Sequence, residues 1–108
     1  MELLPRFTID MIGETRSLKQ VLADNDKELT KRIVTGVLLA IDNDLDYIEI
    51  AEILVPGQCI IIECSRPKYV LTLLTNLNTL IEYEEYELCA EIKKYLNSLQ
   101  KNLGESKY

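Results

Sequence analysis

The chain has 108 residues and a formal net charge of −6, from 18 acidic and 12 basic side chains, and it has no histidine. Because an acidic surface repels phosphate backbones, this balance argues against general nucleic-acid binding. Histidine is the usual general base near neutral pH and the commonest metal ligand, so its absence argues against Ser-His-Asp and Cys-His enzymes and against a metal site. We therefore expect no enzyme activity, no catalytic residues, no metal, no cofactor and no small-molecule substrate.

The length suits a single domain over residues 1–108. The longest apolar run, Val37 to Ile41, is far shorter than the roughly 18 residues that a membrane span needs. Residues 1–10 lack a basic region followed by an apolar stretch, so we expect no secretory signal and no membrane. The expected compartment is the cytoplasm.

Three cysteines are present, Cys59, Cys64 and Cys89. A spacing of five along a strand places the first two on opposite faces, a poor geometry for a disulfide or a shared metal. We expect all three to be small buried apolar side chains.

Residues 1–45 are predicted to hold an arm and helices. Phe7, Ile9 and Met11 alternate as on one face of a strand, and the same stretch also fits a loose extended arm. The pattern of residues 14–23 predicts a short helix.

The clearest helical pattern covers residues 26–42, where apolar side chains recur three and four positions apart. Asp26 is the expected N-cap, with Glu28 in the first turn. Gly36 in the middle of a helix costs about 1 kcal/mol relative to alanine, so it indicates close packing.

Residues 46–64 predict a β-hairpin. Pro56 and Gly57 suit the two central positions of a type II turn, because proline fixes φ and glycine accepts a positive one. A break in the alternation predicts a bulge within residues 51–54. The second strand, Cys59 to Cys64, carries apolar residues on both faces, so we expect helices or a partner to cover both sides.

Residues 66–103 predict an antiparallel helical hairpin. Two apolar stripes with helical spacing meet in an acidic segment, and the spacing of the first stripe continues into Glu84, Glu87 and Glu91. The apolar seam therefore breaks near residues 83–86, which favours two helices over one bent helix. The predicted fold is α+β, with N-terminal helices, a central β-hairpin and a C-terminal antiparallel helical hairpin.

The sequence at about residues 77–99 resembles the UVR motif, a helical hairpin of bacterial excision-repair subunits and of some protease-associated proteins. An aromatic-Glu pair, two small residues, a basic residue and later apolar positions carry the resemblance: Tyr86, Glu87, Cys89, Ala90, Ile92, Lys93, Leu96 and Leu99. Cys89 stands where alanine is usual, and Lys94 where an acidic residue is usual. The resemblance implies a hairpin that pairs with a similar hairpin or with another protein. It does not imply DNA repair.

From these patterns we expect a non-enzymatic protein–protein interaction module that acts through this hairpin and binds a protein partner or itself. Six side chains are the predicted contacts: Tyr83, Tyr86, Ile92, Tyr95, Leu96 and Leu99. The tyrosines also fit positions at the edge of a core.

Other hypotheses stay open. The two-sided strand Cys59 to Cys64 fits a structural protomer of a larger, virion-like assembly. The net charge fits an acidic inhibitor or DNA mimic. A thiol enzyme that uses one of the cysteines is the enzymatic alternative. The composition, rich in Ile, Leu, Asn and Glu, resembles that of small bacteriophage accessory proteins.

Overall fold

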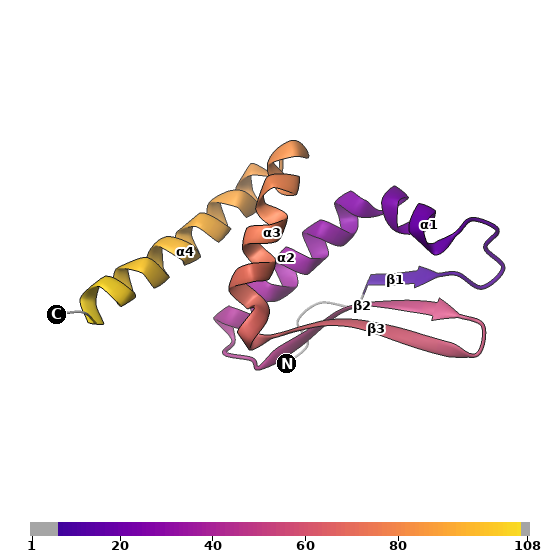
Figure 1. Ribbon diagram of the computed structural model, residues 1–108, viewed down its shortest axis with the longest axis horizontal. Helices are drawn as coiled ribbons and strands as arrows, with labels where there is room; N and C mark the ends of the chain where they lie inside the picture. Colours follow the sequence, from indigo (N-terminus) through magenta and orange to yellow (C-terminus); the bar gives the residue numbers. More distant parts are fainter. Residues whose placement is uncertain (1–6, 107–108) are drawn as a thin grey trace.

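Figure 1 shows a computed structural model of the chain, which describes residues 7–106 and the side chains of residues 7–99. The described elements in chain order are β1 (Phe7–Asp10), α1 (Leu18–Asp24), α2 (Asp26–Asp42), β2 (Tyr47–Val55), β3 (Gln58–Ser65), the short 3₁₀ helix η1 (Arg66–Lys68), α3 (Tyr69–Glu82) and α4 (Tyr86–Ser106). The predicted α+β class, with a central β-hairpin and a C-terminal helical hairpin, is confirmed. Residues 1–6 of the predicted arm, and the side chains of the predicted hairpin after residue 99, lie outside the described part.

The sheet has the strand order β1-β2-β3. β1 pairs in parallel with β2, with Phe7 opposite Ala51, so residues 7–10 form a strand and not a loose arm. Parallel neighbours need a long crossover, which α1 and α2 supply. The helices lie on one side of the sheet in Figure 1, and no helix of residues 7–106 covers the other side. Helices of residues 7–106 therefore do not cover both sides of β3, and coverage of the second side by a partner stays a prediction; Ile61 on β3 is 37% exposed.

β2 and β3 form the predicted antiparallel hairpin, closed between Val55 and Gln58. Gly57 in the connecting turn has a φ of +83°, a left-handed conformation that glycine adopts without steric cost. The bulge lies between Glu49 and Ala51, earlier than the predicted 51–54. The additional residue lets Ile50 and Ala51, neighbours in sequence, both be buried.

The main core forms where α2 packs on the sheet. Val34 and Val37 are fully buried, and a Cβ added to Gly36 would lie 3.4 Å from the Cγ1 of Ile50. The close packing predicted from Gly36 is confirmed, since the glycine lets helix and strand approach closely. Asn25, and not Asp26, is the N-cap of α2; no side-chain hydrogen bond caps the helix.

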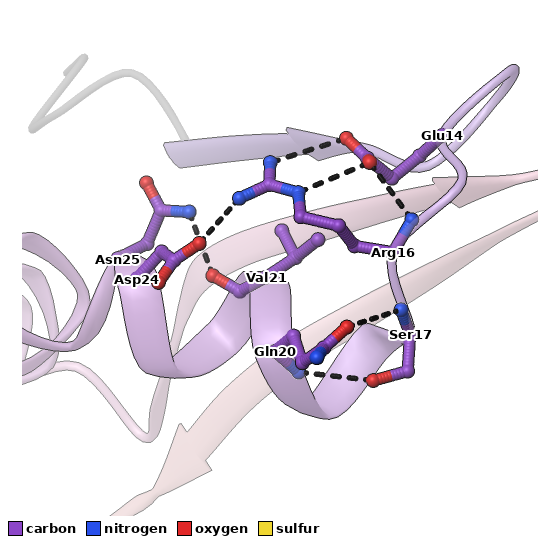
Figure 2. Close-up of polar contacts among 7 residues, drawn as sticks. All are labelled: Glu14, Arg16, Ser17, Gln20, Val21, Asp24 and Asn25. Atoms are coloured by element: carbon purple, nitrogen blue, oxygen red, sulfur yellow. Dashed lines mark hydrogen bonds and ion pairs between the residues drawn. The ribbon is translucent and has the colours of Figure 1, made fainter.

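α1 begins at Leu18, later than predicted, because Ser17 caps it (Figure 2). The hydroxyl of Ser17 accepts a hydrogen bond from the backbone N–H of Gln20, and the Gln20 side chain accepts one from the backbone N–H of Ser17, both at 3.2 Å. This reciprocal capping box satisfies two N–H groups at the helix start. Beside it, the guanidinium of Arg16 pairs with Glu14 and with Asp24 at the other end of α1.

The cysteines differ in burial. Cys64 and Cys89 are buried, as predicted, whereas Cys59 is exposed, so the expectation for Cys59 is wrong. Its thiol donates a hydrogen bond to the Oε2 of Glu52 at 3.5 Å. Cys59 is exposed because it lies near the turn of the hairpin on β3, which is an edge strand.

Candidate functional site

The turn between α3 and α4 reverses the chain at Tyr83 to Glu85, where the sequence predicted a break. The backbone N–H of Glu85 donates to the carbonyl of Leu80 at 2.9 Å, and the N–H of Glu84 donates to that of Ile81 at 3.0 Å. Glu84 has a φ of +61°. This pattern is a Schellman motif, in which a left-handed residue closes the helix and satisfies its last carbonyls. Glycine usually holds that position, so a glutamate there gave no sequence signal.

Side chains of this turn bind the start of α2. The hydroxyl of Tyr83 donates a hydrogen bond to the Oδ2 of Asp26 at 2.6 Å. The Oε1 of Glu85 lies 3.5 Å from the Nζ of Lys31 and 3.7 Å from that of Lys27. The hydrogen bond to the Asp26 carboxylate is the main reason that the pKa of Tyr83 is raised above its ordinary value. Tyr83 therefore holds the hairpin in place and has its hydroxyl engaged within the chain.

The inner face of α4 belongs to the core. Cys89 is 5% exposed and Ile92 is 0% exposed, in one cluster with Leu73 and Leu80 of α3. The prediction of Ile92 as a partner contact needs correction, because a fully buried side chain is not available to another molecule. The helical spacing that marked Ile92 as part of a seam was right, but α2 and α3 already fill that seam.

The remaining predicted contacts lie along α4 with different exposure. Tyr86, at the first position of the helix, is 61% exposed. Tyr95 and Leu96 are half-buried and pack against the edge of the core. Leu99 is half-buried further along the helix. Tyr86 is thus the most accessible of the six, and Tyr95 fits the alternative of a tyrosine at the core edge.

Two hollows lie between α2 and α4, and we call them together the α2–α4 groove. The first has a volume of about 570 Å³ and is lined by Lys31, Thr35, Glu85, Glu87, Leu88, Ala90 and Glu91. The second has about 250 Å³ and is lined by Leu38, Ile41, Asp42, Glu91, Lys94, Tyr95 and Ser98. Glu91 borders both hollows. The lining combines apolar side chains with more carboxylates than ammonium groups, a surface suited to a segment that carries both apolar and basic side chains.

A second polar cluster ties the end of α2 to the start of α3. Arg66 lies 2.8 Å from Asp44 and 2.9 Å from Asp46, and these carboxylates raise the pKa of its guanidinium further. The buried Tyr69 donates a hydrogen bond to the carbonyl of Leu45 at 2.8 Å. Arg66 thus forms ion pairs with both Asp44 and Asp46. No group of three or more potential metal ligands occurs in the part of the chain that the structure describes.

Comparison of this chain with known proteins found no relative. No protein-family model, no curated protein and no solved structure matches this chain. The resemblance of residues 77–99 to the UVR motif therefore stays a prediction. No helix within residues 7–106 is both long enough and apolar enough to cross a membrane.

Proposed function

We propose that this chain is a non-enzymatic protein–protein interaction module that acts through its C-terminal helical hairpin. The proposal includes a cytoplasmic location and a role like that of the bacteriophage accessory proteins whose composition the chain resembles. Its partner is a protein segment with apolar and basic side chains.

The observation that carries the proposal is the arrangement of aromatic side chains and hollows along α4. Tyr86 is 61% exposed at the start of α4, between Glu85 and Glu87, which line the first hollow, and Tyr95 lines the second hollow. Tyrosine is enriched among the residues that dominate binding energy at interfaces, because it offers a large contact area with few rotatable bonds. Glu87 and Glu91 in the lining add carboxylates that attract basic groups.

The turn supports this assignment by fixing the groove. The Tyr83–Asp26 hydrogen bond and the contacts of Glu85 with Lys27 and Lys31 hold α4 against α2. A groove held in one geometry loses less conformational entropy when it binds a partner.

The test uses the full chain as bait, identification of any retained protein, and titration of that purified protein by calorimetry. We expect Tyr86→Ala and Glu91→Lys each to weaken binding by about tenfold or more, as for residues at the centre of an interface. Tyr47→Ala is the matched control, since Tyr47 is 56% exposed on β2 and distant in sequence from the hairpin. Equal loss of affinity in the Tyr47 variant, or full affinity in both hairpin variants, would refute the proposal.

A second candidate function, a structural protomer of a larger assembly, is favoured by the edge strand β3. Ile60 and Ile61 are 41% and 37% exposed there, with side chains that point to opposite faces. Exposed apolar edge strands can pair with a strand of a neighbouring chain. Light scattering at high concentration tests this candidate: large assemblies that Ile61→Lys abolishes support it, and their absence rejects it.

A further inference from the structure

The outer face of α3 is an exposed surface without charge. From Tyr69 to Ile81 the helix carries no charged residue, although 28% of the whole chain is charged. Leu71, Leu74 and Ile81 are 65%, 48% and 41% exposed. They lie three and seven positions apart, so they share one side of the helix. The exposed Thr75 and Asn78 between them are polar but uncharged. Exposed apolar side chains grouped in a stripe on one face of a helix are typical of interaction sites.

The two ends of this stripe carry opposite charges. Lys68 precedes it by one helical turn, and Glu82 and Glu84 follow it. All three side chains are exposed, and neither Lys68 nor Glu82 forms an ion pair within the described side chains of residues 7–99. If a second α3 helix packs on this face in the antiparallel direction, the basic end of each helix therefore lies beside the acidic end of the other.

We propose that the outer face of α3 binds a second copy of this chain, with the two α3 helices antiparallel about a two-fold axis near Leu74 and Thr75. Leu71 of each copy then lies opposite Asn78 of the other, within one turn of its Ile81. Lys68 of each copy lies beside Glu82 and Glu84 of the other. An uncharged face suits this contact, because two copies with a net charge of −6 repel one another elsewhere.

The size of the surface sets the expected strength of the dimer. α3 has 14 residues, which gives a length of about 21 Å. A hollow of about 290 Å³ beside Leu71, lined also by Ile33 and Ile62, extends the apolar face toward the sheet. A helix face about 21 Å long and about 10 Å wide covers a few hundred Å², which even with this extension stays below the roughly 800 Å² per partner of a stable complex. We expect a dimer that dissociates on dilution through micromolar concentrations.

The first experiment is sedimentation equilibrium of the full chain over a dilution series. The expected mass at high concentration is twice the 12.4 kDa of one chain. Leu74→Glu is expected to raise the dissociation constant about tenfold or more. Ile12→Glu is the matched control, because Ile12 is 60% exposed in the segment between β1 and α1. Circular dichroism confirms that each variant is folded, as expected for changes at exposed positions.

The second experiment tests the antiparallel arrangement through its charges. Lys68→Glu alone places like charges together at both ends and is expected to weaken the dimer severalfold. The double variant Lys68→Glu with Glu82→Lys restores one opposite-charge pair at each end, with Glu84 unchanged, and is expected to recover most of the lost affinity. In a parallel dimer, position 68 of one copy faces position 68 of the other, so Lys68→Glu replaces a Lys–Lys pair by a Glu–Glu pair. The double variant then also carries like charges at both ends and gives no recovery.

Besides a double variant that shows no recovery, three results would overturn the proposal. The first is a monomer at every concentration. The second is a dimer that Leu74→Glu leaves intact and that Ile61→Lys on the edge strand dissociates. The third is a monomeric chain whose α3 face binds a different protein in a Leu74-dependent way. Tyr86→Ala on α4 is expected to leave the dimer intact, which separates this inference from the proposed function of the hairpin.

Discussion

Truncation of Ile92 tests whether the start of α4 is part of the core. The side chain is 0% exposed and shares its cluster with Val37 of α2 and with Leu73 and Leu80 of α3, which are also fully buried. Isoleucine-to-alanine changes at such sites cost roughly 2–5 kcal/mol, depending on how far the surroundings collapse. Because three helices enclose Ile92, we expect little collapse and a loss of about 3 kcal/mol for Ile92→Ala. Ile92→Val, which removes one methylene, should cost about 1 kcal/mol.

Urea unfolding followed by circular dichroism measures this loss. With a slope of about 1.5 kcal/mol per molar urea for a domain of this size, the midpoint of Ile92→Ala should fall by about 2 M. Tyr86→Ala on the same helix is the control and should cost less than about 0.5 kcal/mol, because Tyr86 is exposed. If Ile92→Ala shifts the midpoint no more than Tyr86→Ala does, α4 is not packed on α2 and α3 as described.

Three further variants test the turn and the ends of α1. Glu84→Gly should raise the unfolding free energy by about 0.5–1 kcal/mol, since glycine adopts the left-handed conformation without strain; an unchanged or lower thermal midpoint would contradict this. The Asp26 carboxylate raises the pKa of Tyr83. This hydrogen bond therefore stabilises the fold at a pH below the ordinary tyrosine pKa of about 10, and the stabilisation is lost as the pH rises through the raised pKa. Tyr83→Phe should therefore flatten the alkaline loss of stability in urea titrations, and the same slope as the wild type would argue against the contact. Arg16 lowers the pKa of Glu14 from 4.5 to about 2. Their ion pair therefore stabilises the fold fully at a pH above 4.5, and this stabilisation is lost as the pH falls toward 2. Glu14→Gln should reduce the acid dependence in that window, and an unchanged acid profile would show that the pairing adds nothing.

Local patterns predicted the elements whose residues interact with near neighbours. The helix at 26–42 was predicted with the bounds that the structure shows, because its apolar stripe repeats over four turns. The break between α3 and α4 followed from the carboxylates at Glu84, Glu87 and Glu91, which a continuous helix would have placed in the apolar seam. The turn at Gly57 followed from its conformational freedom.

Long-range contacts were not accessible in the same way. The parallel pairing of β1 with β2 joins Phe7 to Ala51, and nothing within either segment specifies that partner. The hydrogen bond from Tyr83 to Asp26 spans 57 positions of sequence. The exposure of Cys59 depends on β3 being an edge strand, which is a property of the whole sheet.

The candidate site could be predicted only in part, because the exposure of each side chain also depends on long-range packing. Helical spacing grouped Ile92, Leu96 and Leu99 on one seam, but spacing alone does not show which part of a seam the protein's own helices fill. The structure buries Ile92 and leaves Tyr86 exposed. The exposure of Leu74 and Ile81 does not follow from their spacing, because it depends on α2 and α4 covering the other faces of α3.

Hydrogen exchange along α4 tests the central claim most directly. If the first turns of α4 pack on α2 and α3, the backbone amides of Ile92 and Leu96 should exchange only through global unfolding, with protection equal to that of Val37 in α2. Exchange of these two amides at the rate of an unstructured peptide, while Val37 stays protected, would contradict the docked hairpin.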